Sequence, residues 1–180
     1  MTMPISSIIS GGQTGADRGG LDAAIACNIP HGGRCPKGRK AEDGVIPAKY
    51  LLQESKSASY TVRTEANVRD SDATVVFTLG RATGGSLKTI EFCHKHKKPC
   101  LHIDLATHDK SRTVKAVVDW LEGRGEYDQD GLFAIKPSVH CNLNVAGSRE
   151  SKAAGIQEMV MVVMVEVVKV FEIRRRKEYL

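Results

Sequence analysis

Three short stretches of this sequence combine glycines with side chains that can bind an anion. They read GGQTGADR from residue 11, TGGS from residue 83 and AGSRES from residue 146. Backbone N–H groups at the start of a helix carry partial positive charge, and glycine lets a phosphate come close to them. Because each stretch follows an apolar run and leads into a helical pattern, the sequence predicts binding of a phosphate or another small anion.

We expect the ligand-binding residues to come from these stretches and from one basic loop. The candidates are Gly11, Gly12, Gln13, Thr14, Gly15, Asp17, Arg18, Lys37, Thr83, Gly84, Gly85, Ser86, Gly147, Ser148, Arg149 and Ser151. Gly12, Thr14 and Gly15 should lie nearest the anion. Arg18 or Arg149 should add positive charge. Each stretch alone also fits an ordinary helix N-cap, so the prediction depends on finding three of them in one small chain.

The glycine spacing argues against two common nucleotide-binding motifs. The first stretch lacks the Walker pattern G-x-x-x-x-G-K-[ST], and it lacks a clean G-x-G-x-x-G. Ordinary ATP hydrolysis and ordinary NAD binding are therefore not expected.

The three stretches can form one site only if the strands before them lie side by side. Apolar runs and helical patterns alternate along the chain: SIIS then a helix to about residue 27, 73–78 then 86–96, 99–105 then 111–122, and 143–147 then a long helix from about 151. This alternation predicts an α/β, Rossmann-like fold with a mainly parallel sheet and helices on both faces. Because the carboxyl ends of parallel strands meet at one edge, a shared pocket is expected there.

Two segments, 31–57 and 123–140, fall outside the alternation. The first is rich in Gly, Pro and charge, and Lys37, Arg39 and Lys40 within it are candidates to close over an anion. We interpret the second as an insertion or a small hairpin. No repeat or low-complexity linker divides the chain, which predicts a single domain over residues 1–180.

The composition favours a small ligand over nucleic acid. The net charge is +5, but aromatic residues make up only 5% of the 180 residues, too few for base stacking along a groove. The five cysteines are an odd number and show no C-x-x-C spacing, which predicts the reducing cytoplasm. Among Cys93, His94, His96, Cys100 and His102 a zinc site is conceivable, but core cysteines and surface histidines are the preferred interpretation.

Residues 156–173 form an unusually apolar helical segment. Acidic and basic residues interrupt it at spacings that would place charge inside lipid, so we expect no membrane span. A helix on the outside of a monomer needs one apolar stripe, whereas this segment is apolar almost all round. It therefore predicts a homo-oligomer, a dimer or tetramer, with this helix at or beside the interface and Val163 facing outward. The alternative is full burial within one subunit.

Several long blocks resemble a known family. GGQTGADRGGLDAA, IPHGGRCPKGRKAEDGVIP, RTEANVRDSDATVVF, TGGS and LNVAGSRES occur in the order found in the circularly permuted YpsA-like branch of the SLOG superfamily, whose members carry the label of molybdenum carrier. The resemblance implies a Rossmann-like SLOG domain in which the LNVAG strand, first in unpermuted relatives, completes the sheet. It also implies a nucleotide or the molybdenum cofactor, molybdopterin, as a bound ligand, with no structural metal in the chain.

The superfamily also contains enzymes, which leaves a second hypothesis. The Lonely Guy and lysine-decarboxylase-like relatives include hydrolases that cleave the N-glycosidic bond of a nucleoside monophosphate. This resemblance implies Arg63 and Glu91 as catalytic residues, since Arg63 precedes a strand and Glu91 stands at the motif's Glu position. The match is incomplete, because Thr83 replaces the motif's Pro and Leu87-Lys88 replace its Gly-Thr. The carrier hypothesis is therefore preferred, with a phosphoribohydrolase-like enzyme as the alternative.

Overall fold

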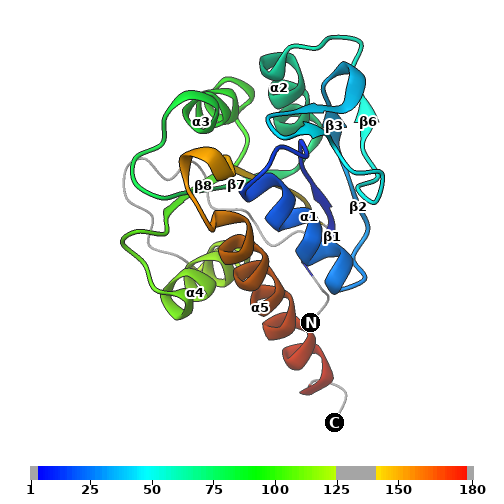
Figure 1. Ribbon diagram of the computed structural model, residues 1–180. Helices are drawn as coiled ribbons and strands as arrows, with labels where there is room; N and C mark the ends of the chain where they lie inside the picture. The colour runs from blue at the N-terminus through cyan, green and yellow to red at the C-terminus, as the bar shows by residue number, and fades with distance from the viewer. Residues whose placement is uncertain (1–3, 125–140, 178–180) are drawn as a thin grey trace.

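A five-stranded parallel sheet forms the centre of the computed structural model, which describes residues 4–124 and 141–177 (Figure 1). In spatial order the strands are β2 (His31–Gly32), β1 (Ile5–Ile9), β9 (Cys141–Gly147), β7 (Ala73–Thr78) and β8 (Cys100–Asp104). All neighbouring strands run parallel. The last strand of the chain thus lies between β1 and β7, in the order that a circular permutation requires. The predicted α/β, Rossmann-like fold is confirmed.

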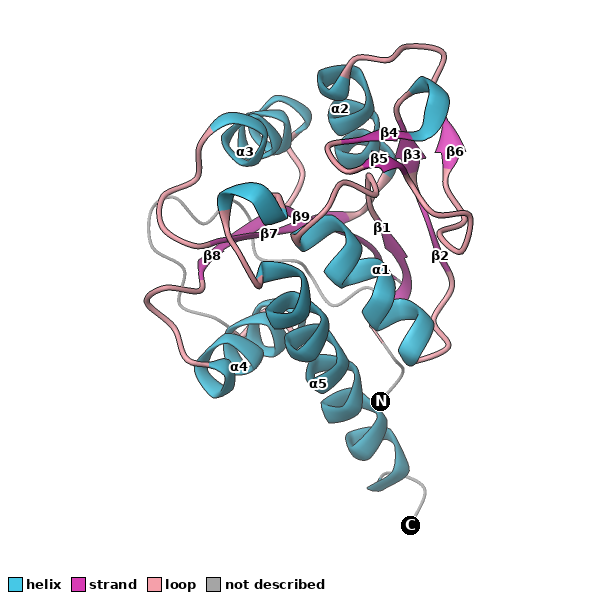
Figure 2. Cartoon of the chain, in the orientation of Figure 1, coloured by secondary structure: helices cyan, strands magenta, loops and turns pink. Residues whose placement is uncertain are grey.

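Helices cover both faces of this sheet (Figure 2). One layer holds α1 (Ala16–Ala26), α4 (Lys110–Leu121) and α5 (Ile156–Lys177), and the other holds α2 (Tyr60–Asp70) and α3 (Gly84–His96). Strand β7 packs against both helix layers because its successive side chains point to opposite faces of the sheet. Val75 and Phe77 pack in the core beneath α4 and α5, whereas Val76 packs with Phe92 and Val68 beneath α2 and α3.

The segment 31–57, expected to lie outside the alternation, begins with β2 as the edge strand of the central sheet, and its remainder folds into a layer beside α1. Its short elements are β3 (Arg34–Cys35), η1 (Lys37–Arg39), β4 (Lys40–Ala41), β5 (Gly44–Val45) and β6 (Gln53–Glu54). Arg39 donates hydrogen bonds to the carbonyl oxygens of four residues of this layer, so it holds the segment together rather than reaching a ligand. Lys37 and Lys40 are exposed. Of the expected insertion at 123–140, residues 125–140 lie outside the described residues.

Two helices differ from the sequence prediction. Helix α2 was not predicted, because its inward positions include the polar residues Arg63 and Asn67. Helix α5 begins at Ile156 rather than near residue 151, after a short helix η2 (Glu150–Lys152). The Glu150 carboxylate accepts hydrogen bonds from the N–H groups of Gly155 and Gln157, and Gly155 has a positive φ of 84°. This turn delays the helix start.

Helix α5 is buried on one side only. Val163 is 3% exposed and packs in the core, so its expected outward orientation was wrong. Met159, Val162 and Ile173 face outward instead. Within the described residues, no helix is long and apolar enough to cross a membrane.

Candidate functional site

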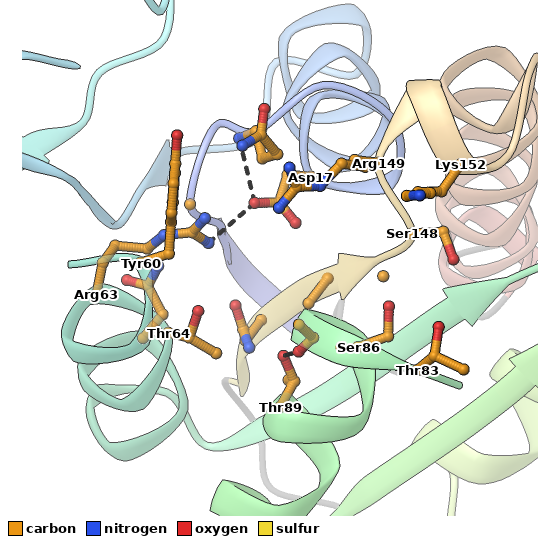
Figure 3. Close-up of a pocket in the computed structure, with 18 residues that line it drawn as sticks. Asp17, Tyr60, Arg63, Thr64, Thr83, Ser86, Thr89, Ser148, Arg149 and Lys152 are labelled. Atoms are coloured by element: carbon orange, nitrogen blue, oxygen red, sulfur yellow. Dashed lines mark hydrogen bonds and ion pairs between the residues drawn. The ribbon is translucent and has the colours of Figure 1, made fainter. Parts of the chain in front are cut away.

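A cavity of about 450 Å³ lies at the carboxyl ends of β1, β9 and β7 (Figure 3). Its lining residues are Gly11, Gln13, Asp17, Tyr60, Arg63, Thr64, Asn67, Thr83, Gly84, Gly85, Ser86, Thr89, Asn144, Ala146, Gly147, Ser148, Arg149 and Lys152. All three glycine stretches contribute, because the three strands before them are neighbours in the sheet. The structure therefore brings these stretches together at one edge of the sheet.

The N-terminus of α3 forms one side of the cavity. The side chain of its N-cap, Thr83, makes no capping hydrogen bond, and the Thr83 carbonyl oxygen accepts from the N–H of Ser86 at 3.1 Å. The N–H groups of Gly84 and Gly85 have no partner among the described residues. A Cβ at Gly84 or Gly85 would meet nothing within 4 Å, so the surroundings of these two glycines are uncrowded. Such a helix end is suited to an anion.

Two cationic side chains stand near this helix end. Figure 3 shows Arg149 and Lys152 on the β9 side of the cavity, with Thr83 and Ser86 across from Ser148. Lys152 makes no ion pair within the described part of the chain, while the Arg149 guanidinium lies 5.9 Å from the ring centre of Tyr60. Arg149 Nη1 is also 3.6 Å from Glu42 Oε2. Two cationic side chains thus line the same cavity as the α3 N-terminus.

The opposite wall contains a buried ion pair. Arg63 Nη1, from α2, lies 3.0 Å from Asp17 Oδ2 in the first turn of α1. The backbone N–H of Gln13 donates to the same oxygen at 3.2 Å. Burial raises the pKa of Asp17 above its ordinary value, although the Arg63 charge acts in the opposite direction. The stability of this buried pair therefore depends on the charges of both partners.

Two buried hydrogen-bond donors on this wall have no partner within residues 4–124 and 141–177. The side-chain oxygen of Gln13 accepts from the N–H groups of Thr14 at 3.0 Å and Glu42 at 2.9 Å, which fixes the amide orientation. The Gln13 Nε2 is left without a hydrogen bond, and so is the Nε of Arg63. Gln13 is 6% exposed and Arg63 7%. Because buried donors are normally paired, their position at a cavity points to acceptor atoms on a ligand.

Part of the first glycine stretch binds an anion of the protein itself. The Glu42 carboxylate accepts hydrogen bonds from the hydroxyl of Thr14 and from the N–H and hydroxyl of Ser151 at 3.2 and 2.6 Å. Burial alone would raise the pKa of Glu42, but these hydrogen bonds outweigh it and hold the pKa below its ordinary value. Thr14, which is buried, and Ser151, which is exposed, thus both have Glu42 as a partner, and neither lines the cavity.

Other predicted residues also have structural partners. Arg18 donates from Nε to the Gly12 carbonyl oxygen at 3.1 Å and binds both carboxylate oxygens of Asp43 at 2.6 and 2.7 Å. A Cβ at Gly12 would lie 2.5 Å from Leu52, so this glycine is needed for packing. None of Gly12, Gly15, Arg18 or Lys37 lines the cavity.

The two residues implied by the enzyme resemblance lie apart. Arg63 lines the cavity, whereas Glu91 does not. Glu91 is exposed on α3, and its carboxylate pairs with Lys88 at 2.8 Å.

Of the residues considered for zinc, the two cysteines lie together in the core, whereas His96 and His102 have other partners. Cys93 and Cys100 are buried, whereas His96 pairs with Glu65 at 2.9 Å and His102 contacts the Thr78 hydroxyl at 2.8 Å. In residues 4–124 and 141–177, no group of three or more His, Cys, Asp or Glu is placed to hold a metal ion.

Sequence reasoning missed several lining residues, namely Tyr60, Thr64, Asn67, Thr89, Asn144, Ala146 and Lys152. Asn144 carried a signal, because it is a polar residue inside the apolar strand β9 and is 2% exposed. The three residues from α2 could not be found before that helix was known.

A parallel sheet with helices on both faces, and a cavity at the carboxyl ends of its strands, defines a Rossmann-like protein with a ligand site in the usual place. Residues 8–168 match the model of the circularly permutated YpsA SLOG family, and the chain belongs to this family. It is similar to the crystal structure of a putative molybdenum carrier protein from Syntrophus aciditrophicus. The identity is 40%, the TM-score is 0.79, and the match covers 93% of this chain and 97% of that one. No curated protein matches the chain.

Proposed function

We propose that the protein binds and carries a small phosphorylated ligand in this cavity, either the molybdenum cofactor or a nucleotide, without chemistry of its own. The observation that supports this most directly is the uncapped N-terminus of α3, where Gly84 and Gly85, whose N–H groups have no partner among the described residues, line the cavity together with Arg149 and Lys152. A helix end of this kind carries about half a positive charge, and cationic side chains beside it add to the attraction for phosphate.

The wall opposite supports a ligand with hydrogen-bond acceptors. Gln13 Nε2 and Arg63 Nε are both donors, and both lack partners. The Tyr60 ring adds an apolar face beside them. Pterins and purines are planar and carry carbonyl oxygens and ring nitrogens that accept hydrogen bonds. A phosphorylated heterocycle thus suits both walls, and a cavity of about 450 Å³ is within the usual range for small-molecule sites.

The molybdenum cofactor is one member of this class, and the similarity to the Syntrophus protein named as a molybdenum carrier supports it. The cavity wall offers amide, guanidinium and hydroxyl groups rather than a set of metal ligands. We therefore propose that any molybdenum enters the cavity as part of the organic cofactor, with its phosphate at the α3 N-terminus. The hydrolase alternative receives no comparable support, because Glu91 is exposed and paired with Lys88.

Two measurements test the proposal. Native mass spectrometry of freshly purified protein should detect a co-purified phosphorylated ligand. Calorimetry with GMP, AMP and inorganic phosphate as probes should then compare Gly85→Asp with Gly85→Asn. A Cβ at Gly85 meets nothing within 4 Å, and the two side chains have nearly the same size, so they differ mainly in charge. The aspartate should weaken phosphate-ester binding by about tenfold or more through like-charge repulsion, whereas the neutral asparagine should have a smaller effect.

Two outcomes would overturn the proposal. One is a purified protein that carries no ligand and binds none of the three probes. The other is an affinity that Gly85→Asp leaves unchanged, since the phosphate would then lie elsewhere.

A further inference from the structure

Helix α5 has an outward-facing row of side chains that its own subunit leaves open. Met159, Val162, Glu166, Lys169 and Ile173 follow one another at intervals of three and four residues, which places them on one face of the helix. We call this row the outer stripe. Met159 and Val162 are each 38% exposed and Ile173 is 54% exposed. The opposite face packs in the core.

The position of α5 leaves this row accessible along its length. Helix α5 packs against α1 and α4, and Figure 1 shows its last turns extending beyond both of them. The helix does not qualify as a membrane span. The row therefore exposes apolar side chains at both ends, Met159 and Val162 at one and Ile173 at the other, with the charged pair Glu166 and Lys169 between them.

We propose that the outer stripe binds the outer stripe of a second copy of this chain, with the two α5 helices antiparallel. The charges of the stripe determine the register. Glu166 and Lys169 are its central pair, joined within one helix at 3.0 Å. An antiparallel pair centred between them places Glu166 opposite Lys169 of the partner copy, and Lys169 opposite the partner's Glu166. Four alternating charges then form the middle of the interface.

The same register also matches the rest of the stripe. An antiparallel axis between residues 166 and 169 places Val162 opposite Ile173 of the partner copy, so these two exposed apolar residues cover one another, while Met159 lies opposite the aliphatic part of Arg176 of the partner copy. It also brings the exposed Glu158 of one copy to the basic end, residues 174–177, of the other. Opposite charges therefore meet at the centre and at both ends.

A parallel arrangement fails on the same residues. It would place Glu166 opposite Glu166 and Lys169 opposite Lys169. It would also bring the two basic ends together, each with Arg174, Arg175, Arg176 and Lys177. Like charges facing each other disfavour an interface. The sequence of the stripe is thus complementary to itself in the antiparallel direction alone.

Charge exchange tests both the partner and the direction. Light scattering at micromolar concentration should give wild type a mass of about 39 kDa, twice the 19.6 kDa of one chain. Glu166→Lys and Lys169→Glu should each raise the dimer dissociation constant about tenfold or more. The double variant with both changes should restore the dimer, as should an equal mixture of the two single variants. Lys56→Glu, at an exposed loop position, is the matched control for charge and should leave the dimer intact.

Cross-linking distinguishes the two directions. In a Cys27→Ser background, Val162→Cys mixed with Ile173→Cys should form a disulfide-linked dimer on oxidation, whereas Val162→Cys alone should not. Cross-linking of Val162→Cys to itself would overturn the antiparallel arrangement. A wild-type mass of 19.6 kDa throughout the micromolar range would overturn the proposal. So would a monomer that sediments with vesicles of anionic lipid, because the stripe would then be a membrane contact.

Discussion

The guanidinium of Arg63 lies 3.0 Å from the carboxylate of Asp17, and 46 residues of sequence separate them. Asp17 is 5% exposed and Arg63 is 7% exposed. The pair ties α2 to the first turn of α1 and forms one wall of the cavity. Arg63 can reach this position because Gly11 has no side chain: a Cβ there would lie 1.6 Å from Arg63 Nη1. The geometry of the wall thus depends on three residues from two distant parts of the chain.

Removing one member of this pair should destabilise the fold strongly. Arg63→Ala leaves the Asp17 carboxylate buried without its cation, and we expect a loss of about 3–5 kcal/mol in the free energy of unfolding near neutral pH. Urea denaturation measures it. The variant Arg63→Gln with Asp17→Asn should lose much less, because neither side chain is charged. Equal losses in the single and double variants would contradict the importance of the ion pair.

The loss of unfolding free energy in Arg63→Ala should also depend on pH. Burial already raises the pKa of Asp17 in the folded protein, and removal of the Arg63 charge should raise it further. A carboxyl whose folded pKa exceeds its unfolded value stabilises the fold when protonated, and this contribution disappears as pH rises through the folded pKa. The deficit of the variant should therefore shrink as the pH is lowered from neutral. A deficit that does not change with pH would contradict this account.

Gly11→Ala should act through the same wall. The new Cβ would overlap the Arg63 guanidinium, so the side chain must leave Asp17 or the backbone must shift. We expect a loss of about 2 kcal/mol or more in unfolding free energy. Gly85→Ala is the matched control, because its Cβ meets nothing within 4 Å and alanine favours the helix by up to about 1 kcal/mol. Similar stabilities of the two variants would contradict the close packing at Gly11.

The sequence predicted the sheet edge and its glycine stretches because these signals are local. The run 73–78 coincides with β7, and the helices after it and after the next strand begin within two residues of the predicted positions. The central position of β9 is not a local property. It follows from pairing with β1 and β7, and only the family resemblance indicated it.

Helix α2 shows why the site itself was only partly predictable. Its inward face includes Arg63 and Asn67, four residues apart, where a helix normally presents apolar side chains. Asn67 accepts from the N–H of Arg34 at 2.7 Å and donates to the Arg34 carbonyl oxygen at 3.0 Å. Asn67 binds the backbone of β3, and Arg63 lines the cavity. Because these inward positions are polar, the apolar periodicity that indicates a helix is weakened. The engagement of Thr14 by Glu42 is equally a contact between distant segments.

The Arg18–Asp43 pair should contribute to stability in a pH-dependent way. The hydrogen bonds from Arg18 hold the pKa of Asp43 below its ordinary value of about 3.9. A carboxyl with a lowered folded pKa stabilises the fold above its unfolded pKa, and this contribution is lost as pH falls through the folded pKa. Asp43→Asn should thus reduce the free energy of unfolding by up to about 1 kcal/mol at neutral pH.

The difference in the free energy of unfolding between Asp43→Asn and wild type should vanish in strong acid. Urea denaturation at several pH values measures it. Glu91→Gln removes an exposed carboxylate paired with Lys88 on the surface of α3, so it is the control for a surface ion pair and should show a smaller change. A difference that persists below the ordinary aspartate pKa would mean that Asp43 acts through its shape rather than its charge.

Glu42 should weaken the attraction of the cavity for anions. Its Oε2 lies 3.6 Å from Arg149 Nη1, so its negative charge offsets a cation that the proposed phosphate would use. Glu42→Gln removes the charge but keeps an oxygen that can accept from Thr14 and Ser151. We expect GMP to bind about two- to fivefold more tightly in low salt, and the gain to fade as salt screens the charges. Calorimetry at two salt concentrations measures this, with Asp70→Asn, at the far end of α2, as the control for net charge. An affinity that falls in Glu42→Gln would mean that the carboxylate holds the loop in its binding conformation.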